Sequence, residues 1–232
     1  PNEQLKSMMS NYDYLNTFLN FKKYSTVFEI DAKDLLSPVN YDIFIKILFL
    51  KNVNNTYNKR LYLRHIKAFN GYKEPDGTKN GKKEFLNSCY SLLNNFDCKK
   101  SIIPISNQGI IIDGSHRVSL SVIKKQKVLC TNFDIDDLFF DFIYFRKRGF
   151  PKKFCDYIGF LIIDLIEDIS CVLININNKK ELNEIIDKMN FEFDVYYYIK
   201  KRKKIIFLFS NLGLNKFLGY SIISHKNQII EE

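Results

Sequence analysis

The stretch from Gly109 to Lys125, GIIIDGSHRVSLSVIKK, constrains the fold more than any other part of the sequence. Its apolar run, residues 110–112, is followed by a polar turn, Asp113 to Arg117, and apolar residues at helical spacing begin directly afterwards. This order predicts a strand, a tight turn and a helix from about Ser115 to Lys125. The polar turn either only connects strand to helix or also binds an anion.

The neighbouring segments predict a compact unit around this stretch. Residues 83–96 place apolar side chains at the i, i+3, i+4, i+7 spacing of an amphipathic helix. Residues 101–113 predict a tight hairpin, in which Gly109 supplies the positive φ of the turn. Residues 127–135 predict another strand. The expected order is therefore helix, strand, strand, helix, strand.

Upstream of this unit the patterns are shorter. Residues 40–50 form an apolar run, and residues 52–60 read as a polar loop. Residues 61–69 precede Gly71 and predict either a short strand or a helical turn. The segment 73–83 mixes turn residues with lysines, which predicts a mobile surface loop of the kind that often carries function.

The C-terminal part predicts a second, smaller α/β unit. Residues 137–169 look helical on both sides of a break at 149–151, where Pro151 would start the second helix. A strand at 171–176, a helix at 179–189 and a hairpin over 191–209 follow. The expected fold class is α/β of the α+β type: a mixed sheet with helices in residues 1–138, and a helical and α/β extension in residues 139–232.

Composition limits the size of the core and the kinds of partner that the chain can have. A chain of 232 residues with 46% hydrophobic content can bury a sizeable core. Its formal net charge of +9 indicates acidic partners, such as nucleic acid, phosphorylated small molecules or an anionic membrane surface. A surface of solvated lysines in a chain biased toward Lys, Asn, Ile and Phe would give the same charge.

Cysteine usage and hydropathy indicate the compartment. The five cysteines are scattered without the spacing of a zinc site, and their odd number argues against a disulfide framework. No run of 18 or more apolar residues predicts a membrane span, and the first residues do not resemble a signal peptide. These features predict a soluble protein of the reducing cytoplasm, of unknown oligomeric state.

The polar turn has the chemistry of an anion site. The first backbone N–H groups of a helix have no partners within the helix, and together with the helix dipole they favour phosphate. Gly114 would let the backbone approach the anion, Ser115 could cap the helix or bond an oxygen, and His116 and Arg117 add donors. The alternative is an ordinary turn, because Asp and Ser are common N-cap residues. The rarity of histidine, only three in the chain, favours function.

The same residues carry a resemblance to a known family. The sequence IIIDGSHRVSLSVIKK, with the helix and the SIIPISNQG hairpin before it, resembles the signature of the ParB and sulfiredoxin superfamily. The resemblance covers roughly residues 83–133, and the N-terminal strand of that fold would lie near residues 61–69. It implies that ATP or CTP is bound, with Gly114, Ser115, His116 and Arg117 holding the phosphates. It also implies that Asp113 lies near magnesium or the attacking hydroxyl.

Two departures narrow the choice within that superfamily. Ser115 stands where sulfiredoxin has its reactive cysteine, which argues against sulfinic acid reduction. ParB proteins more often have a Gly-Glu-Arg-Arg turn followed by a helix-turn-helix, and the C-terminal part of this chain has no such pattern. The kinase-like members with an Asp-Gly-His-His-Arg turn are the most similar.

Further residues are candidates for a phosphoryl-transfer site. Asp113 is the first candidate for the catalytic carboxylate and a magnesium ligand, with His116 beside it. Glu74 and Asp76 are second candidates, because a mobile loop can close over a substrate, although a plain solvated turn explains them better. Arg64 and Lys67 could bind the phosphate of a substrate if residues 61–69 run extended beside the turn.

Three functions remain open on this basis. The first is an ATP- and magnesium-dependent kinase for a small hydroxyl-bearing metabolite, such as a sugar in cell-surface polysaccharide synthesis. The second is a ParB-like, nucleotide-dependent DNA-binding protein, which the basic charge favours. The third is an accessory domain whose polar turn is only a helix cap and which binds no nucleotide.

Overall fold

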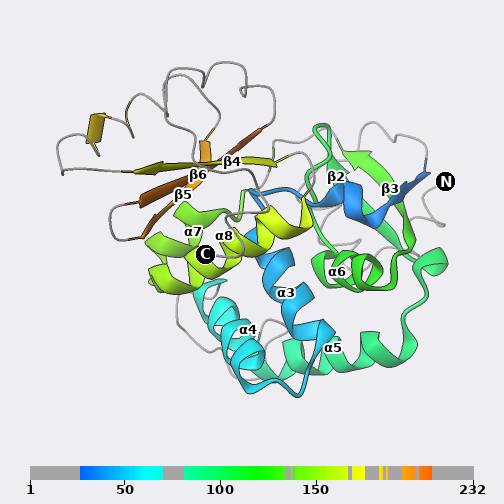
Figure 1. Ribbon diagram of the computed structural model, residues 1–232. Helices are drawn as coiled ribbons and strands as arrows, with labels where there is room; N and C mark the ends of the chain where they lie inside the picture. The colour runs from blue at the N-terminus through cyan, green and yellow to red at the C-terminus, as the bar shows by residue number, and fades with distance from the viewer. Residues whose placement is uncertain are drawn as a thin grey trace. The chain divides into compact units, whose positions relative to one another are not determined.

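The computed structural model describes residues 27–69, 81–133, 137, 139–166, 169–175, 183–184, 187, 195–201 and 204–210 of the chain. By compactness the chain divides into two units, Pro1–Phe150 and Pro151–Glu232, whereas the sequence placed the boundary after residue 138. Each unit contains both helices and strands, which confirms a mixed α and β architecture (Figure 1). The finer expectation, a sheet of the ParB and sulfiredoxin type, stays a prediction.

The sheet of the first unit has three strands in the order β1-β3-β2. Strand β1 (Phe28–Asp31) is antiparallel to β3 (Lys127–Phe133), and β2 (Ile102–Ser106) is parallel to β3. A parallel pair needs a crossover connection, and helix α6 (Ser115–Lys124) lies in the one between β2 and β3. The predicted helix and the two strands around it are therefore confirmed.

The predicted hairpin after β2 is also confirmed, in a shortened form. Gly109 has a φ of 82°, as the turn requires, and the N–H of Ser106 donates to the carbonyl of Ile110 at 2.8 Å. The second arm is only a bridge, in which Ile111 faces Ile105. This arm ends at Ile112, so the chain turns directly into α6.

Helix α3 (Tyr41–Lys51) is the centre of the first unit. It packs against α6 and α4, and every residue from Tyr41 to Leu50 except Leu48 is buried. An apolar run with so little polar surface is typical of a helix enclosed on all sides. The hydroxyl of Ser119 lies 3.1 Å from the carbonyl of Ile43 in this helix and 2.6 Å from the carbonyl of Ser115 in its own helix, so its one proton is shared between the two.

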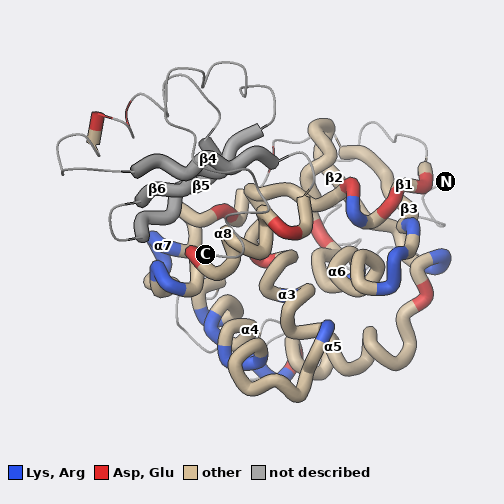
Figure 2. The backbone as a smooth tube through the Cα atoms, in the orientation of Figure 1, with Lys and Arg blue, Asp and Glu red and all other residues tan. Residues whose placement is uncertain are grey.

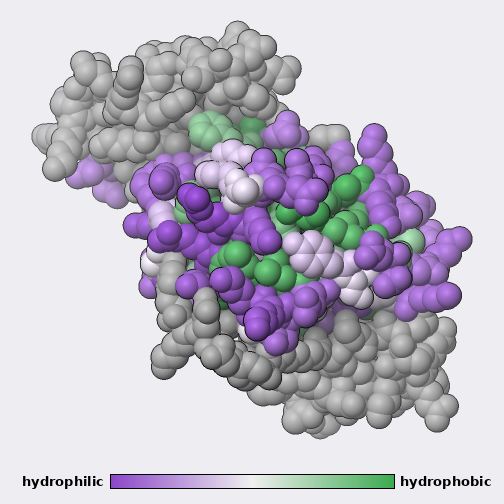
Figure 3. Space-filling view, turned by 90° about the horizontal axis from the view of Figure 1, so that it is seen from below, coloured by the Kyte–Doolittle hydropathy of each residue, from purple (hydrophilic) through white to green (hydrophobic). Residues whose placement is uncertain are grey.

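Helices α4 (Thr56–Phe69) and α5 (Lys82–Asn95) complete the helical layer. Of the two alternatives for residues 61–69, a short strand and a helical turn, the helical one is confirmed, because these residues form the second half of α4. The N-terminal strand that the resemblance placed near them was wrong, and so was the polar loop at residues 56–60, which form the first half of the helix. Asn55 starts this helix, since its side-chain oxygen accepts from the N–H of Asn58 at 3.0 Å. Seen from the side of α4 and α5, the surface is mainly hydrophilic, with hydrophobic side chains between the polar ones (Figure 3).

Shorter elements close the first unit. Two 3-10 turns, η1 (Ala32–Leu35) and η2 (Cys98–Lys100), precede α3 and β2. Helix α7 (Phe142–Lys147) begins at Asp141, whose carboxylate accepts from the N–H of Tyr144 at 2.8 Å. It ends just before the predicted break at 149–151. Phe145 packs at a tilt against Phe150, in an aromatic cluster that also includes Phe69, Phe140 and Tyr144.

The second unit contains helix α8 (Lys152–Leu165) and an antiparallel sheet. Pro151 stands at the N-cap of α8, as the sequence predicted. The sheet has the order β4-β6-β5, with β4 (Ile169–Asn175), β5 (Val195–Lys201) and β6 (Lys204–Ser210). The predicted hairpin is confirmed as β5 and β6. The helix expected at 179–189 lies outside the described residues except for positions 183, 184 and 187.

No helix within the described ranges is long and apolar enough to span a bilayer.

Candidate functional site

Helix α6 begins at a glycine. Gly114 occupies the N-cap position with φ 92° and ψ 18°, and as a glycine it brings no side chain to cap the first-turn N–H groups. The N-cap position that the sequence left open to Asp113 or Ser115 therefore belongs to Gly114 between them. The first-turn N–H groups and the positive end of the helix dipole make this end of α6 attractive to an anion.

A pocket of about 900 Å³ lies in front of this helix end. The whole turn from Asp113 to Arg117 lines it, together with Asp42 and Lys46 of α3. Phe85 and Leu92 of α5 contribute apolar wall, as do Phe69 and Phe140. The volume and the mixture of an apolar wall with a few polar groups are typical of small-molecule sites.

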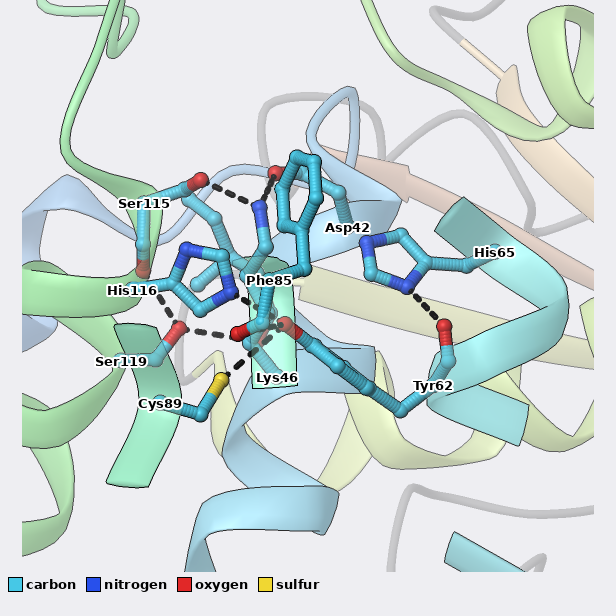
Figure 4. A network of polar contacts seen from close by, with 10 residues as sticks. Asp42, Lys46, Tyr62, His65, Phe85, Cys89, Ser115, His116 and Ser119 are labelled. Carbon is cyan, nitrogen blue, oxygen red and sulfur yellow. Dashed lines mark hydrogen bonds and ion pairs between the residues drawn. The ribbon is translucent and has the colours of Figure 1, made fainter. Parts of the chain in front are cut away.

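Lys46 provides a buried positive charge at the pocket. Its Nζ lies 2.7 Å from Oδ2 of Asp42, one helical turn earlier in α3, and the two side chains are each only 5% exposed. The same Nζ donates to the hydroxyl of Ser115, so α3 is joined to the first residue of α6 (Figure 4). Burial by itself would raise the pKa of Asp42, but the charge and hydrogen bond of Lys46 outweigh it and the pKa is lowered.

Arg117 holds the polar turn against the sheet. Its Nη2 lies 3.2 Å from Oδ2 of Asp113, while Nη1 donates to the carbonyl of Ile102 at 3.2 Å and to the hydroxyl of Ser101. The guanidinium is buried, and these bonds occupy three of its five donors. Arg117 therefore has a structural task beside the phosphate binding that the sequence predicted.

His116 reaches from α6 into a chain of polar contacts between three helices. Its Nε2 lies 2.8 Å from the hydroxyl of Tyr62 in α4, 54 residues away in the sequence. The same hydroxyl receives a hydrogen bond from the thiol of Cys89 in α5 at 3.0 Å (Figure 4). Desolvation first, and then the positive charge of Lys46, hold the pKa of His116 well below its usual value. The imidazole is therefore neutral at physiological pH.

A second histidine, His65, lies close to this chain of contacts and is fully buried. Nδ1 of His65 is 2.6 Å from the carbonyl of Tyr62, and because a carbonyl only accepts, Nδ1 carries the proton. Nε2 of His65 is buried without a hydrogen-bond partner. Burial, with the nearby charge of Lys46, lowers the pKa of His65 to about 3, so this ring is also neutral. The side-chain oxygen of Asn40, at the edge of the pocket, is likewise buried and unbonded.

Arg64 and Lys67, two of the residues that the sequence analysis added to the polar turn, are not among the described residues that line its pocket. Arg64 and Lys67 lie on α4 and, with residues 56, 59, 60 and 63, line a different hollow of about 570 Å³. The extended segment that was to bring them beside the polar turn does not exist, since these residues are helical. Glu74 and Asp76 lie outside the described residues.

The pocket has two carboxylates, Asp42 and Asp113, that could ligate a magnesium ion. Among the described residues no group of three His, Cys, Asp or Glu side chains could hold a metal ion. Magnesium bound with a nucleotide needs fewer, because one or two carboxylates suffice when phosphates and water supply the other ligands. Asp113, whose side chain is 29% exposed at the pocket, fits this requirement better than Asp42, which is buried against Lys46.

Four site residues were missed by the sequence analysis. Asp42 and Lys46 did leave a signal, because they are the only charged residues inside the run YDIFIKILFL and stand at i, i+4. Tyr62 and Cys89 left none, since a tyrosine and a cysteine on apolar helix faces are ordinary core residues. Their importance depends on contacts between helices that no local pattern encodes.

Comparisons of the chain with protein-family models, with curated proteins and with solved structures give no match. The function is therefore inferred from the pocket itself and from the resemblance of the polar turn.

Proposed function

We propose that the protein is an ATP- and Mg²⁺-dependent phosphotransferase that acts on a small hydroxyl-bearing metabolite. The observation that carries this proposal is the N-terminus of α6, which begins at Gly114 and faces a pocket of about 900 Å³ beside the buried cation of Lys46. Helix N-termini and lysine are the usual partners of phosphate. The acceptor we propose is a sugar, as in cell-surface polysaccharide synthesis.

Different residues of the pocket would bind different parts of the nucleotide. The backbone of Gly114 and Ser115, with Lys46 and the remaining donors of Arg117, would bind the phosphates. Phe85 and Leu92 offer an apolar surface for the base of the nucleotide. These assignments follow the positions of the side chains around one cavity.

Phosphoryl transfer requires positioning and neutralisation of charge. The bond from the γ-phosphorus to ADP breaks as the acceptor oxygen bonds to that phosphorus, and the hydroxyl proton passes to a carboxylate. Asp113 is the pocket carboxylate nearest in sequence to the helix end, and it is the more exposed of the two. Magnesium held there would neutralise phosphate charge. Glu74 and Asp76 remain second candidates for the same role.

Nucleotide binding tests the proposal directly. Thermal shifts with Mg²⁺ and ATP, CTP or GTP should show stabilisation by at least one nucleotide, which is lost in His116→Ala, Arg117→Ala and Lys46→Met. Arg64→Ala, in the separate hollow, is the matched control and should keep the shift. If no nucleotide shifts the protein, the phosphotransferase proposal fails, and if the pocket variants keep the shift, the site is wrong.

A DNA-binding function has one specific observation in its favour. Helix α4 carries Lys59, Arg60, Arg64 and Lys67 and has no acidic residue in its sequence, so positive charge gathers along it (Figure 2). Phosphate-driven binding weakens steeply with salt. A gel shift with duplex DNA that disappears between low and physiological salt, and is reduced in Arg60→Ala, would favour this second function.

A further inference from the structure

His116, Tyr62 and Cys89 form an array of polar contacts that centres on the hydroxyl of Tyr62. The thiol of Cys89 is 3.0 Å from the hydroxyl oxygen of Tyr62, and this oxygen is 2.8 Å from Nε2 of His116. Cys89 and Tyr62 are fully buried, whereas His116 is partly exposed and lines the pocket. The array therefore starts in the core and ends at the candidate site.

The proton of Tyr62 has two possible acceptors. One is Nε2 of His116 at 2.8 Å, and the other is the carbonyl of Phe85 at 3.2 Å. The carbonyl lies inside α5, where the helix's own ladder already supplies it with an N–H donor. The imidazole nitrogen is closer, and a pyridine-type nitrogen is the stronger acceptor. These two differences favour donation from Tyr62 to His116 over donation to the carbonyl of Phe85.

The protonation states of Cys89 and Tyr62 agree with a hydrogen bond from Tyr62 to His116. Burial raises the pKa of the Cys89 thiol to about 11, so that the thiol stays protonated and can donate. Burial likewise raises the pKa of Tyr62, so the phenol keeps its proton. The thiol fills one lone pair of the phenol oxygen, and the phenol proton points to the histidine.

We propose that Tyr62 and Cys89 are positioning residues that hold neutral His116 with its proton on Nδ1, so that Nδ1–H donates a hydrogen bond to the anionic ligand of the pocket. The ligand part of this inference rests on the proposed function. In Figure 4 the ring nitrogen that does not face Tyr62 lies on the side of Ser115, at the open end of α6.

The charges around His116 explain why a neutral donor suits this place. Lys46 with Asp42 from α3, His65 from α4, and Arg117 with Asp113 from its own turn and helix surround the ring. A further positive charge among Lys46, Arg117 and the helix end would be repelled. A neutral Nδ1–H still supplies a directed hydrogen bond, and it does so without titrating between pH 6 and 8.

In this arrangement the group that donates a hydrogen bond to the ligand and the group that accepts the proton of the acceptor hydroxyl belong to different residues. An imidazole with its proton on Nδ1 has its only basic nitrogen, Nε2, bonded to Tyr62 and turned away from the pocket. His116 therefore orients the phosphoryl group, and the hydroxyl proton of the acceptor goes to Asp113.

The tautomer can be measured without any ligand. In protein labelled with ¹⁵N-histidine, the pyrrole-type and pyridine-type nitrogens give separate signals, and couplings to the ring carbon protons identify which nitrogen is which. At pH 7 we expect His116 to be neutral with the proton on Nδ1. A proton on Nε2, or a charged ring, overturns the proposal whether or not the protein binds a nucleotide.

A variant tests the role of Tyr62. In Tyr62→Phe the proton should move partly or wholly to Nε2, while Tyr90→Phe, an exposed tyrosine of α5, should leave the tautomer unchanged. The dissociation constant for MgATP, or for inorganic pyrophosphate as a probe, should rise roughly threefold to tenfold in Tyr62→Phe only. An unchanged tautomer in folded Tyr62→Phe contradicts the positioning role. Absence of nucleotide binding in the wild type contradicts the proposed function instead.

Discussion

Gly114 and Arg117 are in closer contact than any residue with a side chain at position 114 would permit. A Cβ built on Gly114 would stand 2.6 Å from Nη2 of Arg117 and 2.8 Å from Cδ1 of Ile103. The sequence suggested that glycine makes room for an anion at this position. The structure shows that the missing side chain makes room for the guanidinium, which in turn holds Asp113.

Substituting the two turn glycines should separate conformational strain from this close contact. Gly109→Ala meets nothing within 4 Å and should cost only its left-handed backbone, about 1–2 kcal/mol. Gly114→Ala adds a clash with Arg117 and Ile103, which overpacking data place at about 1–3 kcal/mol more. Urea unfolding of both variants measures the difference, and equal losses would show that Arg117 does not fill this space.

Local sequence patterns predicted the part of the fold that each pattern encodes by itself. Helix α5, strand β2, the turn at Gly109 and helix α6 all have their own periodicity or turn chemistry, and they lie where the sequence placed them. For residues 61–69 the pattern left a short strand and a helical turn open, because Tyr62 and His65, two polar side chains on the buried face, weakened the helical pattern.

Only one side of the candidate site could be predicted from the sequence. The turn at residues 113–117 was recognised because its chemistry is contiguous in the sequence. Its partners Lys46 and Tyr62 come from helices far upstream, and which helices meet is decided by packing. Spacing along one chain therefore reveals the turn and not the opposite wall of the pocket.

The Asp42–Lys46 pair should show strong coupling. Lys46→Met leaves a buried carboxylate without its cation and should cost about 3–5 kcal/mol, whereas adding Asp42→Asn should return much of that loss. The free energy of unfolding of the single and double variants gives the coupling. Lys152→Met is the control, because the Lys152–Asp156 pair of α8 has the same separation in sequence but is more exposed, so its loss should be below about 1 kcal/mol. Additive losses at Asp42 and Lys46 would contradict the coupling.

Acid should destabilise the protein through His65. Its folded-state pKa of about 3 lies below the ordinary value of 6.5, so the unfolded chain binds a proton that the folded chain excludes. Stability is complete above pH 6.5 and falls as pH drops toward 3, by about 1.4 kcal/mol per pH unit, or about 2 kcal/mol between pH 7 and pH 5. His116 acts in the same direction.

The variant His65→Asn isolates this contribution. Its amide nitrogen can take the place of Nδ1 and donate to the carbonyl of Tyr62, but it does not titrate. Urea unfolding at pH 7, 6 and 5 should therefore show about 2 kcal/mol less loss in the variant than in the wild type. The same pH dependence in both proteins would mean that His65 is charged in the folded state.

Arginine at position 117 should not be replaceable by lysine. The guanidinium bridges Asp113 and the start of β2, at Ser101 and Ile102, with donors that point in fixed directions, and a single ammonium cannot reach all three. Arg117→Lys should lose about 2–3 kcal/mol of stability, since hydrogen bonds of a charged, buried group are among the stronger ones. Amide exchange in the 113–117 turn should also become faster. Arg60→Lys, on the exposed side of α4, is the matched control and should change the stability by less than about 0.5 kcal/mol. A stable Arg117→Lys protein with unchanged exchange would mean that charge alone, and not the planar fork, fixes the turn at the head of α6.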